Sequence, residues 1–283
     1  MKSNLNYEYV FTQLVKYVGD YCIKNDIDST ILGISGGIDS TVVAAILRQV
    51  AIDYKIDFYG YSLPTKTTDN KEQTVADLVG LNFCTHFEKR ALDEVGNHIG
   101  HTLIKNDLGI IETTLLPAQT RRFGNIKSRL RMLYLYDFAA KNKGIVIGTD
   151  NYTEYLLGFS TIGGDALYDL CPIKYLWKTE VYKLADWLIK HYLDSDELDL
   201  MYTVHRSRRL IPQDGLGISK SDFEQFGVNS YQEVDTILYN FINNLPRTCE
   251  VGKVIDLYLK NSFKRIHPID VSRDVYAESG LVR

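Results

Sequence analysis

The sequence predicts an α/β fold, a doubly wound parallel sheet with helices on both faces. Three observations lead to this prediction: short apolar runs alternate with helical patterns, two of the runs end in glycine, and no internal repeat interrupts the order. Alternating strands and helices indicate a parallel sheet, because a strand rejoins the sheet in the same direction only through a long crossover, usually a helix. We expect a single domain over residues 1–283.

The first half of the chain supplies most of the predicted sheet. An amphipathic N-terminal helix, with Val10, Leu14 and Val18 on one side, precedes a buried strand over residues 30–34. An apolar helix through residues 42–47 follows that strand directly. The alternation then continues with strands at 58–63 and 82–87 and with helices at 70–79 and 92–103.

The second half adds one more strand. A long helix over residues 126–140 delivers the short apolar run 144–148, which again ends in glycine. Because parallel strands end at the same edge of a sheet, the turns after Ile34 and Ile147 should meet at the edge where open α/β folds bind ligands. Helices resume near residue 178 and over residues 231–243.

Two segments lack regular periodicity. The glycine-rich stretch 158–165 is too long for a simple connection and indicates a functional loop. The region near 203–220 combines His205 and several arginines with turn-forming residues, which predicts a flexible lid or insertion.

Composition narrows the class of function. The net charge of −4 and the isoelectric point near 5.9 argue against a general role on nucleic acid or a membrane surface. No apolar run is long enough to span a bilayer, and the N-terminus lacks the apolar core of a signal peptide. The cysteines, at positions 22, 84, 171 and 249, show no metal-ligand spacing. These features favour small-molecule partners, reduced thiols and a cytoplasmic location.

The most specific motif is Ser35-Gly-Gly-Ile-Asp-Ser40, which joins the first predicted strand to the following helix. Glycines allow backbone N–H groups to approach a phosphate, and the helix N-terminus adds its positive dipole end. The loop lacks the lysine of a Walker A motif and carries Asp39 instead, which indicates a metal ion beside the phosphates. The simpler alternative for Asp39 is a helix N-cap.

This motif resembles the SGGxDS signature of the N-type ATP pyrophosphatases, the PP-loop superfamily, whose fold is adenine nucleotide alpha hydrolase-like. Further segments, in the same order along the chain, resemble the ammonia-dependent NAD synthetases over roughly residues 15–195. They are GNIKSRLRM at 124–132, GTDNYTE at 148–154, GFSTIGGD at 158–165 and DLCPIKYLWKTEV at 169–181, with weaker similarity at 216–219 and 264–265.

The resemblance implies a ligase that converts nicotinic acid adenine dinucleotide to NAD. ATP would adenylate the carboxylate with loss of pyrophosphate, and ammonia would then displace AMP. The resemblance also implies Mg²⁺ as cofactor, a homodimer, and ammonia taken up free or from a separate amidotransferase. Neither a nucleic acid nor a membrane is an expected partner.

The resemblance assigns roles to individual residues. Asp39, Lys178 and Asp165 are the implied catalytic residues, and Asp39 with Glu154 is the implied metal pair. The implied ATP site consists of Ser35, Gly36, Gly37, Ile38, Asp39, Ser40, Thr149 and Lys178, and the implied substrate site of Tyr21, Arg129, Asp165 and Lys264. A core aromatic is the alternative for Tyr21, and an exposed basic helix face is the alternative for Arg129.

The chain also departs from the family pattern. Ser62 stands where the family usually has an arginine before Leu-Pro, Ile162 replaces a lysine, and Phe263 replaces a histidine. The Ser/Thr-Ala-Asp-Leu segment is missing between residues 201 and 212, where Thr203 or Ser207 is the candidate replacement for its hydroxyl. These departures leave two alternatives open: a divergent PP-loop amide ligase that adenylates another acid, and a nucleotide-binding module without catalysis.

Overall fold

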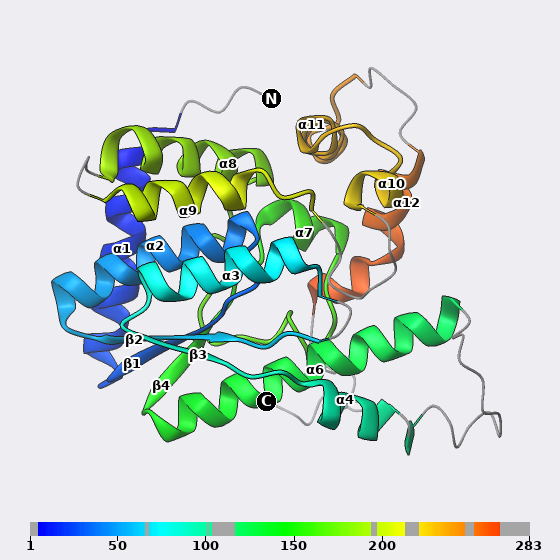
Figure 1. Cartoon of the computed structure of the whole chain (residues 1–283). Coiled ribbons are helices and arrows are strands. Elements are labelled where there is room, and N and C mark those ends of the chain that lie inside the picture. The colour runs from blue at the N-terminus through cyan, green and yellow to red at the C-terminus, as the bar shows by residue number, and fades with distance from the viewer. Residues whose placement is uncertain are drawn as a thin grey trace, which may run out of the picture.

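A computed structural model describes residues 5–65, 68–100, 102–103, 117–193, 197–212, 221–246 and 252–266. Its centre is a parallel sheet of four strands in the order β3-β2-β1-β4 (Figure 1). The strands are β1 (Ser29–Gly33), β2 (Asp57–Ser62), β3 (His86–Lys89) and β4 (Gly144–Ile147). In the register, Ile31 of β1 pairs with Tyr59 on one side and with Val146 on the other. The predicted parallel sheet is confirmed.

Helices cover both faces of this sheet, as Figure 1 shows. One face carries α1 (Tyr7–Lys24), α2 (Ile38–Tyr54), α3 (Asn70–Phe83), α8 (Lys178–Trp187) and α9 (Leu198–Arg208). The other face carries α4 (Asp93–Gly100) and α6 (Pro117–Lys141). The core on the first side contains Val18, Leu32, Val43 and Leu184, and the core on the second contains Ile31, Leu130 and Phe138. The doubly wound class predicted from the alternation is therefore confirmed.

The predicted strand over residues 82–87 is wrong in position. Residues up to Phe83 belong to α3, and β3 begins only at His86. The helix extends this far because Val75, Val79 and Phe83 are buried at a spacing of four residues, which keeps them on one helix face. Asp69 caps the start of α3 by accepting hydrogen bonds from the backbone N–H groups of its first turn.

The first part of the region near 203–220, which lacks clear periodicity in the sequence, is helical through Arg208 at the end of α9, and the lid itself stays a prediction. The buried face of α9 consists of Leu200, Thr203, Val204 and Ser207, at helical spacing. Two of these four residues are polar, so the periodicity is hidden when only apolar residues are counted. Residues 213–220 of this prediction lie outside the described residues.

A smaller helical layer covers the carboxyl end of β4. It consists of α7 (Tyr152–Leu157), α10 (Asp222–Phe226), α11 (Tyr231–Ile242) and α12 (Gly252–Lys260), followed by a 3-10 turn over Ser262–Arg265. These helices share an apolar cluster that includes Leu157, Trp177 and Leu238. Through this cluster the C-terminal part of the chain holds α7 and the start of α8 beside the end of the sheet.

Two further expectations concern the described residues only. The cysteines among them, at positions 22, 84 and 171, are free thiols, and Cys249 lies outside this set. Within the same residues, no helix combines the length and the apolar character needed to cross a membrane.

Candidate functional site

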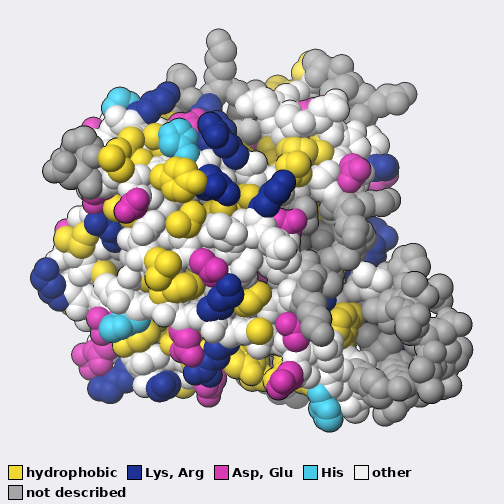
Figure 2. Space-filling view, in the orientation of Figure 1, with side chains coloured by type: hydrophobic (Ala, Val, Ile, Leu, Met, Phe, Trp, Pro, Cys, Tyr) yellow, Lys and Arg dark blue, Asp and Glu magenta, His cyan; other side chains and the backbone are white. Residues whose placement is uncertain are grey.

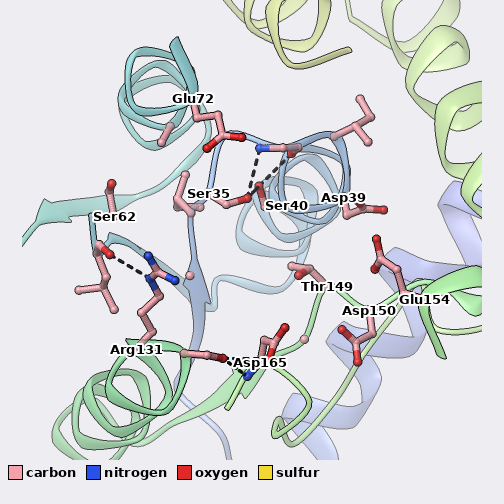
Figure 3. Close-up of a pocket in the computed structure, with 18 of the residues that line it drawn as sticks. Ser35, Asp39, Ser40, Ser62, Glu72, Arg131, Thr149, Asp150, Glu154 and Asp165 are labelled. Carbon is pink, nitrogen blue, oxygen red and sulfur yellow. Dashed lines mark hydrogen bonds between the residues drawn. The ribbon is translucent and has the colours of Figure 1, made fainter. Parts of the chain in front are cut away.

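A cavity of about 360 Å³ opens at the carboxyl ends of β1, β2 and β4. Its walls come from the loop after β1, the loop after β4, the first turn of α3 and the middle of α6 (Figure 3). Parallel topology explains this convergence, because all these strands end at the same edge. The turns after Ile34 and Ile147 therefore do meet, as the sequence predicted.

The loop after β1 has the backbone shape of a phosphate site. Gly36 has a φ of +83°, and a Cβ atom there would lie 2.5 Å from the Glu72 carbonyl oxygen of α3. Only glycine fits this combination of positive φ and close approach. Gly37 is the N-cap of α2, so the helix starts at Ile38 and its first turn lies beside the cavity. This arrangement rules out Asp39 as the N-cap of α2.

Hydroxyl groups hold the loop in this shape. The Oγ atoms of Ser35 and Ser40 lie 3.0 Å apart, and Ser40 Oγ donates to the Gly37 carbonyl oxygen at 2.9 Å. The Gly37 N–H in turn donates to Ser35 Oγ at 3.2 Å. The loop is therefore ordered by its own side chains.

Ser207 of α9 supports the same loop from behind. Its Oγ donates to the Gly36 carbonyl oxygen at 2.7 Å and accepts from Thr41 Oγ1 at 2.9 Å. Ser207 lines the cavity, whereas Thr203 is fully buried and accepts a hydrogen bond from Asn82 Nδ2. Of the two candidate replacements named from the sequence, Ser207 is the one that reaches the cavity.

Three charged side chains meet on one side of the cavity. Lys178 Nζ, at the first residue of α8, donates to Asp39 Oδ2 at 2.5 Å and to Glu154 Oε1 at 2.9 Å. The side chains are only 4%, 15% and 18% exposed, in the order Lys178, Asp39 and Glu154. The predicted pair of carboxylates and the predicted lysine thus lie in direct contact, and we call these three residues the charged triad.

Asn151 connects the triad to the start of α7 and was not identified from the sequence. Its side chain accepts from the Glu154 N–H in a capping box, and its Nδ2 donates to Asp39 Oδ1 at 2.9 Å. The capping box has a recognisable pattern, a cap residue three positions before Glu. That pattern marks the helix start, but the bond to Asp39 depends on tertiary structure.

Burial shapes the protonation of the triad. Burial and the negative charge of Asp39 raise the pKa of Glu154 to about 7, although Lys178 opposes the shift. For Lys178, burial favours the neutral form, but attraction to Asp39 and Glu154 outweighs it and raises its pKa well above the ordinary value. Lys178 is therefore charged at neutral pH, while Glu154 is poised to gain or lose a proton.

Asp150 is a further acid on the cavity wall that the sequence did not single out. Burial, and next the negative charge of Asp165, raise its pKa well above the ordinary value. Thr149, the preceding residue and a predicted ATP contact, also lines the cavity (Figure 3). The loop after β4 thus contributes Thr149 and Asp150 side by side.

The predicted substrate residues do not lie together as the residues of the triad do. Asp165 lines the cavity, and its Oδ1 accepts from Ser128 Oγ at 2.9 Å and from the Thr161 N–H at 2.7 Å. Arg129 is exposed, and its Nε donates to the Ile162 carbonyl oxygen at 3.3 Å. The structure therefore places Asp165 in the site and Arg129 on its outer side.

Two other predicted substrate residues do not line the cavity. Lys264 Nζ donates to the carbonyl oxygens of Gly158 and Ser160, at 2.9 and 2.7 Å, and so holds the start of the 158–165 loop. Tyr21 lies near the end of α1 with 36% of its surface exposed. It therefore does not belong to the main buried core, which was the alternative for this residue.

Among the described residues, no group of three or more His, Cys, Asp and Glu side chains is arranged to hold a metal ion. The acidic pair Asp39 and Glu154 therefore lacks a third protein ligand of these types within this part of the chain.

Comparison with known proteins identifies relatives that match most of the chain. The NAD synthase family matches residues 10–268. The NH3-dependent NAD+ synthetase of Thermoplasma volcanium is 30% identical over 263 residues, which covers 92% of this chain and 97% of that protein. The corresponding protein of Thermoplasma acidophilum is 32% identical and covers 87% of this chain and 91% of its own.

Solved structures show the same fold. The NMN synthetase from Francisella tularensis superimposes with a TM-score of 0.76 at 21% identity, covering 95% of this chain and 100% of that one. The NH3-dependent NAD synthetase from Campylobacter jejuni, solved with a nitrate ion, gives 0.69 at 24% identity with the same coverage.

Proposed function

Because the chain belongs to the NAD synthase family, we propose that it is an ammonia-dependent ligase that converts nicotinic acid adenine dinucleotide to NAD with ATP. The contact of Lys178 with Asp39 and Glu154 is the observation that carries this proposal, because it lies directly beside the loop after β1, residues 35–40, which we call the glycine loop. A backbone loop whose shape suits phosphate binding lies here beside a buried cation and two carboxylates. This combination suits cleavage of ATP between its α and β phosphates. The curated relatives with 30% and 32% identity are named NH3-dependent NAD+ synthetases.

The proposed reaction has two steps. A carboxylate oxygen of the substrate attacks the α phosphorus of ATP, the bond to the β phosphate breaks, and pyrophosphate leaves. Ammonia then attacks the acyl carbon, AMP leaves with its phosphate oxygen, and one proton is released. The protein contributes position and electrostatics to both steps.

The residues divide this work between them. The backbone of residues 35–40 receives the leaving pyrophosphate, and Lys178 supplies positive charge beside it. We assign Asp165, which is exposed at the cavity wall and fixed by Ser128, as the acceptor of the one proton that the attacking ammonia releases. Ser207 and Ser40 keep the loop ordered, so little reorganisation is needed when charge develops.

Asp39 and Glu154 fit a magnesium site. Mg²⁺ is commonly bound by one or two carboxylates together with substrate phosphates, and these two carboxylates already converge on one cation. When bound there, magnesium would neutralise charge on the departing pyrophosphate.

A second candidate function is amidation of a different acid by the same chemistry. Ile162 and Phe263 replace polar residues expected from the family pattern, and Phe263 is 51% exposed rather than packed in the site. The solved NMN synthetase with the same fold suggests nicotinic acid mononucleotide as one acid to compare.

Pyrophosphate release tests these proposals. The purified chain is incubated with ATP, Mg²⁺, ammonium and each acid in turn, and the nucleotide products are separated. We expect AMP and pyrophosphate, not ADP, with nicotinic acid adenine dinucleotide. If pyrophosphate is released only with nicotinic acid mononucleotide, that acid is the substrate in place of the dinucleotide. If no acid leads to pyrophosphate release, the result favours the non-catalytic nucleotide-binding module.

We further propose a homodimer in the cytoplasm that takes ammonia free or from a separate amidotransferase. The exposed aromatic side chains of α1, Tyr9, Tyr17 and Tyr21, support the dimer, because exposed apolar surface favours contact with a partner. Light scattering of the purified chain measures the assembly, and a monomer at working concentration would contradict it.

A further inference from the structure

Arg131 is a cavity residue that the proposed reaction leaves without a role. It lies on α6, and its Nε donates to the Leu63 carbonyl oxygen at 3.0 Å, just beyond the end of β2. It is partly buried and lines the cavity, and Figure 3 shows its guanidinium directed inward. Arg129, two residues earlier, is exposed instead.

The charge of Arg131 is poorly compensated by the protein. Within the described part of the chain, ion pairs engage Lys178, but none engages Arg131. Burial lowers its pKa from the ordinary value, and the more distant charges of Asp165 and Glu72 only partly oppose this. An arginine remains charged at neutral pH, so a partly desolvated guanidinium without a carboxylate partner favours an anionic ligand.

Its position suggests which anion it meets. Arg131 stands across the cavity from Asp39 and Glu154 in Figure 3, with Ser62 beside it and Asp165 below. If the glycine loop and the triad hold the pyrophosphate end of ATP, the anionic groups nearest the opposite wall are the α-phosphate and the carboxylate that attacks it. Nε is engaged by Leu63, which leaves the two terminal nitrogens for such a group.

We propose that Arg131 is a substrate-binding residue whose guanidinium receives an anionic oxygen at the junction of nucleotide and acid, on the α-phosphate or on the substrate carboxylate. The proposal rests on the proposed function for the identity of the acid. Its competitor is a purely structural role, in which Arg131 only ties α6 to the end of β2.

Replacement by glutamine separates the two roles. Arg131→Gln can still donate to the Leu63 carbonyl oxygen but has no charge, whereas Arg131→Lys keeps the charge without the planar fork. Lys141→Met removes an exposed cation from the same helix and serves as the matched control. Calorimetry measures the dissociation constants of ATP and of nicotinic acid adenine dinucleotide for each variant, and melting temperature monitors the fold.

We expect Arg131→Gln to raise the dissociation constant of one of the two ligands by at least about tenfold, the scale of a hydrogen bond to a charged group. The melting temperature should stay unchanged. Arg131→Lys should fall between Arg131→Gln and the wild type, and Lys141→Met should match the wild type. Loss of ATP affinity identifies the α-phosphate as the partner, and loss of dinucleotide affinity identifies the carboxylate.

Dissociation constants of Arg131→Gln within threefold of the wild type for both ligands would overturn the proposal. If the wild type releases no pyrophosphate with the dinucleotide, the proposed substrate fails. The ATP measurement then decides the role of Arg131 alone, and unchanged ATP affinity overturns it. If Arg131→Gln does not fold, Arg131→Lys is judged by the same ATP and dinucleotide comparison.

Discussion

The two sides of the cavity differ in how their charges are satisfied. On the triad side, Lys178 forms ion pairs with both Asp39 and Glu154, so opposite charges are already paired before any ligand is present. On the opposite side, which we call the substrate side, Arg131 on the cavity wall donates only to a backbone carbonyl oxygen in its described hydrogen bond. Arg129 and Lys264, which lie behind this wall and do not line the cavity, also contact only backbone carbonyl oxygens in their described hydrogen bonds. The charged side chains on the triad side are therefore paired in the protein without a ligand, whereas the Arg131 guanidinium on the substrate side is free to pair with an anionic ligand.

This difference predicts that changes on the triad side affect chemistry and those on the substrate side affect affinity. We expect Asp39→Ala or Glu154→Ala to lower turnover by at least about a hundredfold, the scale of one lost electrostatic element. Initial rates of pyrophosphate release at saturating substrates measure it, with Lys141→Met as the control. A loss below tenfold in both variants would remove the distinction between the two sides.

The triad side also predicts a pH dependence of stability. The pKa of Glu154 is raised to about 7 in the folded protein, above its ordinary value of 4.5, so the folded state binds the extra proton between these values. The stabilisation is complete below about pH 4.5 and is lost as pH rises through about 7.

Glu154→Gln should remove this pH dependence. Between pH 5 and pH 8 we expect the wild type to lose about 2 kcal/mol more unfolding free energy than Glu154→Gln, since one pKa unit corresponds to about 1.4 kcal/mol. Urea unfolding at both pH values gives the difference, and the comparison cancels the other titrating groups. Parallel curves for the two proteins would show that the triad fixes Glu154 in one protonation state.

On the substrate side, Lys264→Met should raise the KM for the acid by about tenfold and leave the KM for ATP unchanged. The side-chain ammonium group of Lys264 holds the loop that carries Asp165 through the carbonyl oxygens of Gly158 and Ser160. Losing a hydrogen bond from a charged group costs about 1.5 kcal/mol or more. Steady-state kinetics with each substrate varied separately measures the split. Equal changes in both KM values would mean that the two sides are not independent.

The smallest expected effect concerns the support of the glycine loop. Ser207→Ala should raise the KM for ATP by about fivefold, because about 1 kcal/mol is typical of one hydrogen bond. Thr203→Ala, on the same helix but away from the cavity, is its matched control and should leave this KM unchanged. Similar KM values in both variants would assign Ser207 a purely structural role.

Sequence reasoning predicted the parts of the site that topology controls. Glycine turns after two parallel strands had to meet at one sheet edge, so Asp39 and Glu154 could be placed together before their contact was known. A helix was also predicted to resume near residue 178, and α8 begins at Lys178. The fold class followed from the alternation of strands and helices in the same way.

Other features depend on tertiary contacts that local pattern does not encode. Asn151 and Ser207 matter because of partners 112 and 171 positions away, and polar residues on the buried face of α9 concealed its helical period. Arg131 was passed over because its neighbour Arg129 matches the family motif, although only Arg131 points into the cavity. Which of the two arginines lines the cavity depends on the face of α6 from which its side chain extends.

The bond between Ser207 and Gly36 has a consequence for how the protein is made. The six residues of the glycine loop, 35–40, are contiguous, yet part of their support comes from Ser207, 171 positions after Gly36 in the chain. Contacts of such long separation form late, because the intervening chain must first be synthesised and ordered. During translation, the loop would therefore emerge early and reach its final shape only after most of the polypeptide has left the ribosome.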